Sequence, residues 1–218
     1  MCWFKISMKK YVILIPIYND RESLTELIEN INSEIQVVNL DISVVVINDA
    51  SSQQIIDEYK NTQNITSIEI INMKENRGHS RCIASGLKYI YEKKEFDYVI
   101  PMDGDGEDRP EEIKSFIKLA EKSTDQSIVG ERTKRSESAF FKLCYLSHKI
   151  ITLAFTGQSI KFGNFTCLSK STVEKMLKEK ATWNSFSRSL KKIEKNLLSI
   201  PSIRGIRYYG PSKMSFFN

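Results

Sequence analysis

The chain has 218 residues, 41% of them hydrophobic and 27% charged, a composition typical of a globular protein with a substantial core and unlike a collagen, a low-complexity repeat or a disordered chain. No run of about 18 apolar residues occurs, so the sequence predicts no segment that spans a membrane. The net charge of +5 is unevenly distributed: residues 1–125 carry 15 Lys/Arg against 22 Asp/Glu, whereas residues 126–218 carry 17 against 5.

Strands and helices are predicted to alternate in the first 130 residues. Continuous apolar runs predict buried strands over residues 11–17, 42–47, 65–71, 97–102 and 126–129. Apolar residues at helical spacing and capping residues predict helices over residues 21–38, 53–61, 80–93 and 110–122. Alternating units of this length predict an α/β fold with a mostly parallel, doubly wound central sheet flanked by helices.

The pattern after Gly130 is less regular. The predicted elements there are helices over residues 139–155, 170–179 and 184–195 and strands over residues 162–168 and 198–208. No linker or internal repeat divides the chain, so we expect a single domain over residues 1–218. Residues 208–218 combine basic and aromatic side chains and are predicted to lie close to a membrane surface.

The charge distribution and the cysteines narrow the class of partner. A basic C-terminal half favours phosphate-bearing ligands or an anionic membrane face. Nucleic acid is the weakest candidate, because the aromatic residues of that half have apolar neighbours and do not alternate with Lys and Arg. The four cysteines are scattered without a CxxC motif, which indicates reduced thiols of a cytosolic protein. His79 and His148 are assigned no role.

Four carboxylates follow the fourth predicted strand within six residues: Asp103, Asp105, Glu107 and Asp108. Such a cluster repels itself unless a cation neutralises it, so it is typical of a site for a hard metal ion with oxygen ligands. The C-terminal end of a parallel strand is also where open α/β sheets bind ligands. A solvated acidic turn before a helix is the alternative, and the spacing alone does not separate the two.

Five short motifs then follow in the order and spacing of family 2 glycosyltransferases. They lie at residues 16–20, 46–51, 76–78, 102–105 and 130–135, and residues 162–165 and 210–213 extend the match. The chain resembles this family over about residues 10–213, and within it the polyprenyl-phosphate glycosyltransferases similar to dolichol-phosphate mannose synthase. The resemblance implies the GT-A fold, a nucleotide-sugar domain built on a Rossmann-like sheet.

The resemblance also implies a role for individual residues. The residues that would bind the nucleotide sugar are Pro16, Tyr18, Asp20, Asn48, Asp49, Arg77, Asp103 and Gly104. Asp103 and Asp105 match the Asp-x-Asp motif that binds Mg2+ or Mn2+, and Glu107 stands where this group usually has Gln, which offers the metal an extra carboxylate. The chain departs from the family pattern at Asp20, Asn48 and Thr166, where Glu, Asp and Arg are usual.

Charge arguments support a catalytic role for Asp105, Arg132 and Arg135. A nucleoside diphosphate leaving group is highly anionic, and a dication on the carboxylates would neutralise it as the sugar bond breaks. The two arginines follow a predicted strand whose neighbour is expected to end in the cluster of carboxylates, and they would add charge-assisted bonds to phosphate oxygens of donor and acceptor. Further candidates for binding an acceptor phosphate are Ser138, Lys142 and Lys213.

The carboxylates of the C-terminal part bear on the acceptor. A hydroxyl acceptor needs a general base, whereas a lipid phosphate is already ionised and needs cations. After Arg132 the acidic residues are Glu137, Glu174, Glu179 and Glu194, and the last three lie on or beside predicted basic helices. This favours a phosphate as the acceptor.

The resemblance, together with the charge arguments, therefore implies an inverting, Mg2+- or Mn2+-dependent transfer of a sugar from a UDP- or GDP-sugar to a membrane polyprenyl phosphate, either undecaprenyl or dolichyl. The expected location is the cytoplasmic face of the membrane. Two alternatives stay open: a GT-A enzyme that uses a glycan hydroxyl, and a catalytically silent module that binds a nucleotide sugar. A homo-oligomer is compatible with the sequence, which defines neither the oligomeric state nor the sugar or base.

Overall fold

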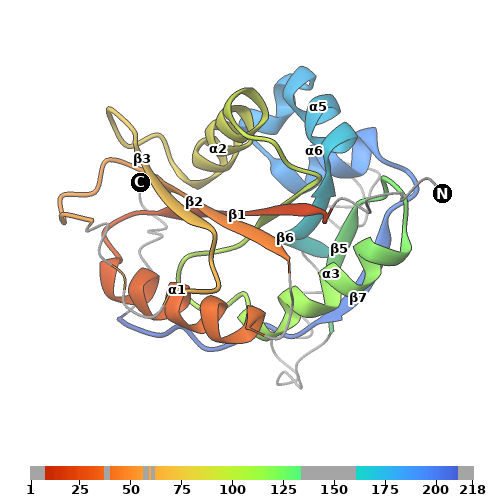
Figure 1. Cartoon of the computed structure of the whole chain (residues 1–218). Helices are drawn as coiled ribbons and strands as arrows, with labels where there is room; N and C mark the ends of the chain where they lie inside the picture. Colours follow the sequence, from red (N-terminus) through yellow and green to blue (C-terminus); the bar gives the residue numbers. More distant parts are fainter. Residues whose placement is uncertain (1–7, 37–39, 56–58, 60–61, 134–160, 211–218) are drawn as a thin grey trace, which may run out of the picture.

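A seven-stranded sheet forms the centre of the computed structural model, which describes residues 8–36, 40–55, 59, 62–133 and 161–210 (Figure 1). The strand order is β3-β2-β1-β4-β6-β5-β7. The strands are β1 (Lys10–Ile17), β2 (Asp41–Asn48), β3 (Ser67–Asn72), β4 (Tyr98–Pro101), β5 (Ile128–Arg132), β6 (Phe162–Ser169) and β7 (Leu198–Ser202). Strands β1 to β4 pair in parallel, as do β5 and β7, whereas β6 is antiparallel to both β4 and β5. The predicted α/β fold with a mostly parallel sheet is confirmed.

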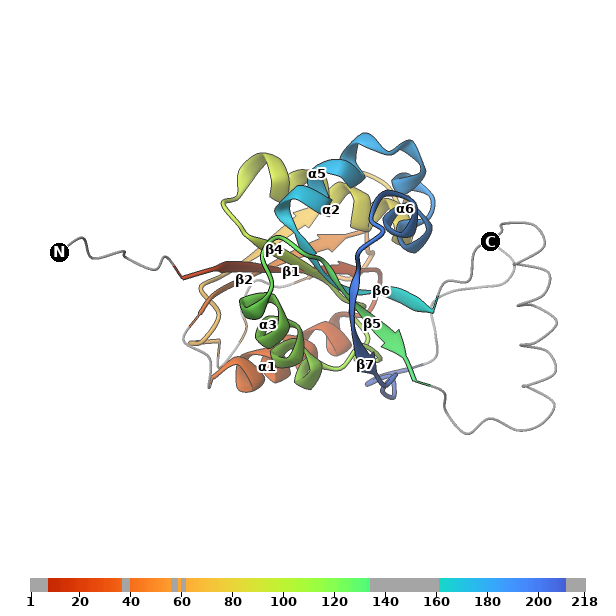
Figure 2. The same ribbon diagram turned by 90° about the vertical axis from the view of Figure 1, so that its right-hand side faces the viewer.

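Helices cover both faces of this sheet (Figure 2). On one face lie α1 (Arg21–Ile35) and α3 (Ile113–Lys122), the latter preceded by the 3-10 turn η1 (Pro110–Glu112). The other face is covered by α2 (His79–Lys93), α5 (Lys170–Lys178), η2 (Lys180–Trp183) and α6 (Phe186–Ile193).

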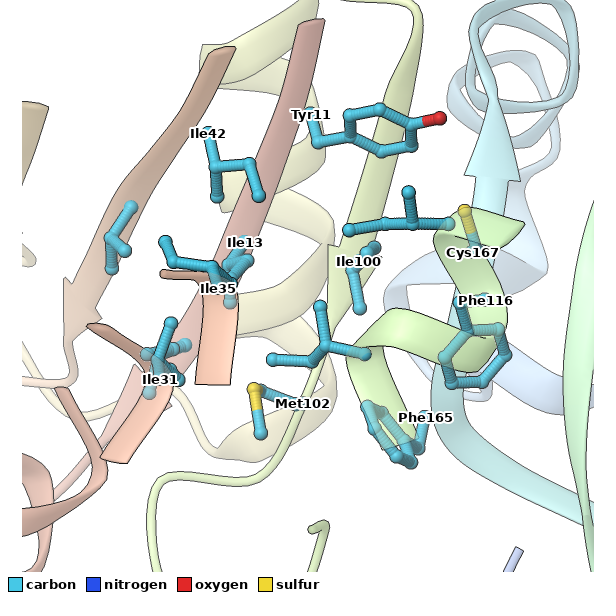
Figure 3. Close-up of a cluster of buried hydrophobic side chains, with 14 of the residues drawn as sticks. Tyr11, Ile13, Ile31, Ile35, Ile42, Ile100, Met102, Phe116, Phe165 and Cys167 are labelled. Carbon is cyan, nitrogen blue, oxygen red and sulfur yellow. The ribbon is translucent and has the colours of Figure 1, made fainter. Parts of the chain in front are cut away.

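The continuous apolar run of β1 is explained by this two-sided cover. Side chains alternate along a strand, so Tyr11 and Ile13 pack into the cluster beneath α1 and α3, while Val12 and Leu14 pack against α2 on the opposite face. Figure 3 shows the first cluster, where Phe116 of α3 meets β6. Both clusters anchor the strands whose C-terminal ends carry the polar motifs.

Several predicted elements differ from the structure. The predicted strand over residues 198–208 ends at Ser202, because residues 203–210 leave the sheet and run along the acidic loop. The predicted helix over residues 53–61 does not form at residues 53–55 or 59, and its remaining residues lie outside the described ones. The predicted helix over residues 139–155 also lies outside them.

The position of β5 corrects one expectation about the site. The sequence argument placed the strand before Arg132 next to the strand that ends in the acidic loop. In the structure β6 lies between β4 and β5 and pairs with both. Within the described ranges, no helix is both long and apolar enough to cross a bilayer, and the expected single domain over residues 1–218 stays a prediction.

Candidate active site

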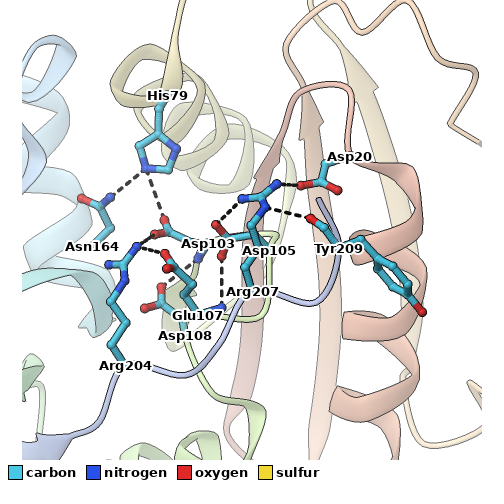
Figure 4. Close-up of polar contacts among 10 residues, drawn as sticks. All are labelled: Asp20, His79, Asp103, Asp105, Glu107, Asp108, Asn164, Arg204, Arg207 and Tyr209. Atoms are coloured by element: carbon cyan, nitrogen blue, oxygen red, sulfur yellow. Dashed lines mark hydrogen bonds and ion pairs between the residues drawn. The ribbon is translucent and has the colours of Figure 1, made fainter. Parts of the chain in front are cut away.

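Polar side chains gather where β1, β2 and β4 end. Because these strands are parallel, the residues after each of them lie at the same edge of the sheet. Asp20 follows β1, Asp49 follows β2, and the acidic loop begins at Asp103, two residues after β4. The structure therefore places Asp20 close to the carboxylates of the acidic loop (Figure 4).

The acidic loop, residues 103–108, is folded by its own carboxylates. The buried Asp108 carboxylate accepts a hydrogen bond from the backbone N–H of Asp103 (2.8 Å), and Asp105 Oδ1 accepts one from the N–H of Glu107 (3.0 Å). A Cβ at Gly104 would lie 3.0 Å from the carbonyl oxygen of Pro16, so the loop's close approach to β1 depends on glycine. These contacts hold Asp103 and Asp105 in a fixed loop.

The electrostatics of the loop are unfavourable without cations. Burial raises the pKa of the Asp105 carboxyl above its ordinary value, and the neighbouring charge of Asp103 raises it further, while Arg204 lowers it. Burial likewise raises the pKa of Asp108 well above its ordinary value, again with a contribution from Asp103, and Arg132 opposes this. The loop thus stores repulsion that a cation would relieve.

Two arginines from residues 203–210 supply that positive charge, and neither was singled out from the sequence. Arg207 Nη1 lies 2.7 Å from Asp105 Oδ2, and its Nη2 pairs with Asp20. Arg204 pairs with Glu107 and lies 3.9 Å from Asp103 Oδ2. The signal available in the sequence was the excess of basic residues after residue 125, which does not say which of them reach the acidic loop.

His79, the first residue of α2, also reaches the acidic loop. Its Nε2 lies 3.4 Å from Asp103 Oδ1 and 2.7 Å from Nδ2 of Asn164 on β6 (Figure 4). Asp103 Oδ1 is buried and, among the described residues, accepts no hydrogen bond. A buried carboxylate oxygen in this state is suited to a metal ligand.

The predicted metal ligands fit a hard cation by chemistry, since Asp103, Asp105 and Glu107 offer only carboxylate oxygens. Asp103 has one oxygen without a hydrogen bond, and all three side chains are partly accessible, with 20%, 19% and 27% of their surfaces exposed. The described residues nevertheless contain no group of three or more His, Cys, Asp or Glu side chains already arranged around a common metal position. Binding would therefore require these side chains to turn toward the ion.

Asn48 and Asp49, predicted to bind the nucleotide sugar, are engaged in building the neighbouring loops. The Asp49 carboxylate accepts hydrogen bonds from the backbone N–H groups of Arg77 (2.7 Å) and Gly78 (2.8 Å). Asn48 donates to Asn72 Oδ1 (2.7 Å) and accepts from a backbone N–H. Both are buried, so their observed contacts are structural, and direct contacts to a ligand stay a prediction.

The other residues predicted to bind the nucleotide sugar fall into two groups. Pro16 is buried at the end of β1, and Tyr18 is 41% exposed beside it. The guanidinium of Arg77 pairs with Glu75, and Arg77 is one of the residues that line a cavity of about 400 Å³ together with Arg81 and Trp183. The structure does not bring the Arg77 side chain to the carboxylates.

Of the predicted phosphate-binding residues, Arg132 is described and lies near the acidic loop. It ends β5, and its guanidinium covers Gly163, where a Cβ would lie 2.7 Å from Nη2. Its charge lowers the pKa of Asp108, so it belongs to the same electrostatic environment as the loop. Four other predicted residues lie outside the described ones: Arg135, Ser138, Lys142 and Lys213.

Comparison with known protein families identifies the family of this chain. The profile of the family described as "Glycosyl transferase family 2" matches residues 12–183, a stretch that includes Asp20, the acidic loop and β6. The chain belongs to glycosyl transferase family 2. This is the family that the motifs predicted, and the assignment of its active site to the sheet edge with Asp103 and Asp105 stays a prediction.

Curated relatives of this family 2 glycosyltransferase include two enzymes named undecaprenyl-phosphate 4-deoxy-4-formamido-L-arabinose transferase. The one from Proteus mirabilis is 28% identical over 225 residues, and the one from Photorhabdus laumondii is 30% identical over 226. In each case the match covers 96% of this chain and 64% of the relative. The predicted resemblance to polyprenyl-phosphate glycosyltransferases is confirmed, and the chain spans about 64% of the length of these relatives.

Solved structures of other glycosyltransferases share the fold. The mannosyltransferase PcManGT from Pyrobaculum calidifontis, in complex with GDP-Man and Mn2+, has a TM-score of 0.62 at 16% identity. The match covers 94% of this chain and 59% of the mannosyltransferase chain. S. aureus TarS 1-349 in complex with UDP-GlcNAc has a TM-score of 0.60 at 14% identity, and the match covers 92% of this chain and 60% of the TarS chain. At these identities the similarity shows the fold alone, and the predicted GT-A fold is confirmed.

Proposed function

We propose that this family 2 glycosyltransferase transfers a sugar from a UDP- or GDP-sugar to a polyprenyl phosphate, with inversion at the anomeric carbon and dependent on Mg2+ or Mn2+. The observation that carries the proposal is the meeting of an acidic loop with arginines from two distant parts of the chain, Arg132 and residues 204–207. A site that must hold a dication, a diphosphate and an acceptor phosphate together requires both kinds of charge.

Donor binding is assigned to the edge formed by β1, β2 and β4. Asp103 and Asp105 would hold the cation, with Glu107 as a further ligand, and when bound the cation would neutralise charge on the departing diphosphate. Asp49 shapes the loop of residues 76–78, so its contribution is to position the backbone around the nucleotide. Tyr18, exposed beside Asp20, offers an aromatic face to the base.

We assign the acceptor as an anion because the described carboxylates after Arg132 are paired with lysines and are not presented to the acidic loop as a general base. Each of the three described carboxylates after Arg132 pairs with a lysine on the surface: Glu174 with Lys178, Glu179 with Lys192, and Glu194 with Lys175. β6 presents the amide of Asn164, rather than a carboxylate, to His79, whose ring lies beside Asp103 of the acidic loop. A phosphate oxygen needs no base, and Arg132 can orient it for attack at the anomeric carbon.

The curated relatives support the same acceptor, since their names specify undecaprenyl phosphate. An acceptor of this kind resides in a bilayer, so we place the enzyme at the cytoplasmic face of the membrane, held peripherally or by an anchor. Lys213 and residues 135–142 are proposed to contribute further cations there.

A glycan hydroxyl is the second candidate acceptor. The imidazole of His79 lies beside Asp103, and a neutral imidazole nitrogen can accept the proton of an attacking hydroxyl. In this alternative His79 would be the general base, and His79→Gln would abolish transfer. With a phosphate acceptor the same variant would retain most of its activity.

A donor and acceptor panel tests the proposal. The full chain would be incubated with UDP- and GDP-activated sugars, including an activated 4-deoxy-4-formamido-L-arabinose, and with either undecaprenyl phosphate in detergent or soluble glycans. We expect a lipid-linked sugar, lost with EDTA and restored by Mn2+. Transfer to a soluble glycan only would establish the hydroxyl alternative, and transfer unaffected by EDTA would exclude the metal.

A further inference from the structure

Residues 203–210 form a strap that crosses the acidic loop. Two backbone hydrogen bonds attach it, from Gly205 N–H to the carbonyl of Glu107 (2.7 Å) and from Tyr208 N–H to the carbonyl of Asp105 (2.9 Å). The Tyr208 ring covers Gly106, and its hydroxyl accepts a hydrogen bond from Asn30 of α1 (3.0 Å). The strap backbone is therefore attached independently of its arginine side chains.

Arg207 on this strap connects the two loops assigned to donor binding. It contacts Asp105 of the acidic loop and Asp20 after β1, while its Nε donates to the carbonyl of Tyr209 (2.9 Å) (Figure 4). The side chains in this bridge are largely buried: Arg207 is 15% exposed, Asp20 10% and Asp105 19%. The carboxylate that would bind the metal is thus already bound by a fixed cationic group.

We propose that Arg207 is an internal cation that competes with the divalent metal for the Asp105 carboxylate. Without a ligand, the guanidinium neutralises Asp105 and keeps the two loops together. With the metal and the donor diphosphate bound, Asp105 would hold the ion, and the released guanidinium of Arg207 would be free to pair with the diphosphate. The inference rests on the proposed function, because it assumes that Asp105 is a metal ligand.

The contacts around Arg207 allow this exchange without unfolding the strap. Asp20 keeps a second partner, since its Oδ1 accepts a hydrogen bond from Ser23 (2.7 Å), so its carboxylate is not left unpaired when the guanidinium moves. The backbone hydrogen bonds of Gly205 and Tyr208 do not involve the Arg207 side chain. A change of side-chain rotamer is therefore sufficient, and the guanidinium stays within reach of a diphosphate bound at Asp105.

Competition between Arg207 and the metal predicts the direction in which metal affinity changes when Arg207 is removed. If two cations exclude each other from one carboxylate, removing the first must strengthen binding of the second, because coupling between two binding events is reciprocal. A purely structural arginine would have the opposite effect: its loss would loosen the loop and weaken metal binding. The direction of the change in metal affinity separates the two roles.

The test is Mn2+ binding to the full chain without nucleotide, measured by electron paramagnetic resonance for wild type, Arg207→Gln and Arg109→Gln. Arg109 is the matched control, because it lies beside the acidic loop but pairs with Glu111 at 3.5 Å. We expect Arg207→Gln to bind Mn2+ at least about fivefold more tightly than wild type, and Arg109→Gln to bind it less than about twofold differently. Equal or weaker binding by Arg207→Gln, or no Mn2+ binding by any form, would overturn the proposal.

Thermal unfolding provides a second readout that guards against a folding defect. Without metal, Arg207→Gln should melt below wild type, since Asp20 and Asp105 lose their shared cation. Saturating Mn2+ should raise its melting temperature more than that of wild type. An equal or smaller rise than in wild type would contradict the competition.

These measurements and the acceptor panel can fail separately. A protein that transfers sugar to undecaprenyl phosphate but binds Mn2+ equally well with and without Arg207 would refute only the internal cation. A protein in which Arg207→Gln tightens Mn2+ binding but no lipid-linked sugar forms would refute only the proposed acceptor.

Discussion

The acidic edge and the basic strap of this site are built in contrasting ways. The acidic loop follows a buried parallel strand and is fixed by short-range contacts, such as Asp108 to the N–H of Asp103. The strap lies outside the sheet, and its arginines reach Asp105 and Glu107 across about one hundred residues of sequence. The comparison teaches that the carboxylates proposed to hold the cation are close in sequence, whereas the positive charges that neutralise them in the unliganded protein depend on tertiary packing.

The largest expected effect concerns the acidic side. Asp105→Asn removes the charge that would hold the cation but keeps an oxygen to accept the N–H of Glu107. We expect sugar transfer to fall by about 10²- to 10³-fold, because the charge that would hold the cation against the leaving group is lost. Steady-state kinetics measure this, with Glu111→Gln as the control, since Glu111 lies on η1 and pairs with Arg109.

Asp105→Asn with more than half of wild-type turnover would show that the carboxylate is not a metal ligand. A comparable loss in Glu111→Gln would show instead that the reaction responds to the total acidic charge of this region. Either outcome would mean that Asp105 has no specific role distinct from the overall negative charge of this region.

A glycine comparison tests how closely the acidic loop must approach β1. A Cβ at Gly104 would lie 3.0 Å from the Pro16 carbonyl, and one at Gly86 of α2 would lie 2.3 Å from a methyl of Leu14. Both Ala variants should lose about 1–3 kcal/mol of unfolding free energy through overpacking. Only Gly104→Ala should also weaken binding of UDP or GDP, measured by calorimetry, because Gly86 contacts the opposite side of the sheet from the loop.

Normal nucleotide affinity in a folded Gly104→Ala protein would show that the loop tolerates displacement. The structural argument for a fixed cation position would then fail, although the fold itself would be unaffected.

Substitution of Asp49 tests whether this carboxylate stabilises the neighbouring loop or binds the metal. Asp49→Asn leaves one acceptor where the carboxylate now accepts from the N–H groups of both Arg77 and Gly78. We expect a loss of about 1–3 kcal/mol in unfolding free energy, measured with urea, since one of two partly buried N–H groups loses its charged acceptor. Mn2+ affinity without nucleotide should stay within about twofold of wild type, whereas a large loss would place Asp49 among the metal ligands.

The smallest effect is expected far from the site, at Glu69. Its hydrogen bond from Lys94 is the main reason that its pKa is lowered from the ordinary value of 4.5, and Tyr89 adds to this. A lowered pKa in the folded state gives stability that is present above pH 4.5 and is lost as the pH falls through the folded pKa. Glu69→Gln should therefore cost less than about 1 kcal/mol at pH 7, and the difference from wild type should vanish in acid.

Urea unfolding of the two proteins between pH 3 and pH 7 gives this difference directly. A constant difference across that range would mean that the effect of Glu69→Gln arises from packing and not from charge.

The first half of the fold follows from the sequence because its signals are local. The apolar runs of β1 and β2 are buried on both faces, and the acidic loop begins at Asp103, two residues after β4. The carboxylates could be assigned from their density and from the motif they match. The position of β6 between β4 and β5 could not be predicted. β6 begins more than sixty residues after the end of β4, and antiparallel pairing at that separation leaves no local signal in the sequence.

The missed residues share the same cause. Arg204 and Arg207 fall in residues that read as the continuation of a strand, but Gly205 and Tyr208 bond to the acidic loop in place of a neighbouring strand. His79 was assigned no role because a lone histidine carries no pattern, and only the start of α2 at the sheet edge brings it to Asp103. Conversely, Arg77 matched a motif by position, yet it is one of the residues that line a cavity with Trp183.

The most direct test of the account is the position of the metal. Crystals of the full chain grown with Mn2+ and a nucleoside diphosphate would be measured at the manganese absorption edge. We predict one anomalous peak between the carboxylates of Asp103 and Asp105, with the diphosphate on its open side. A peak elsewhere in the molecule, or a bound diphosphate with no metal beside these two residues, would contradict the account.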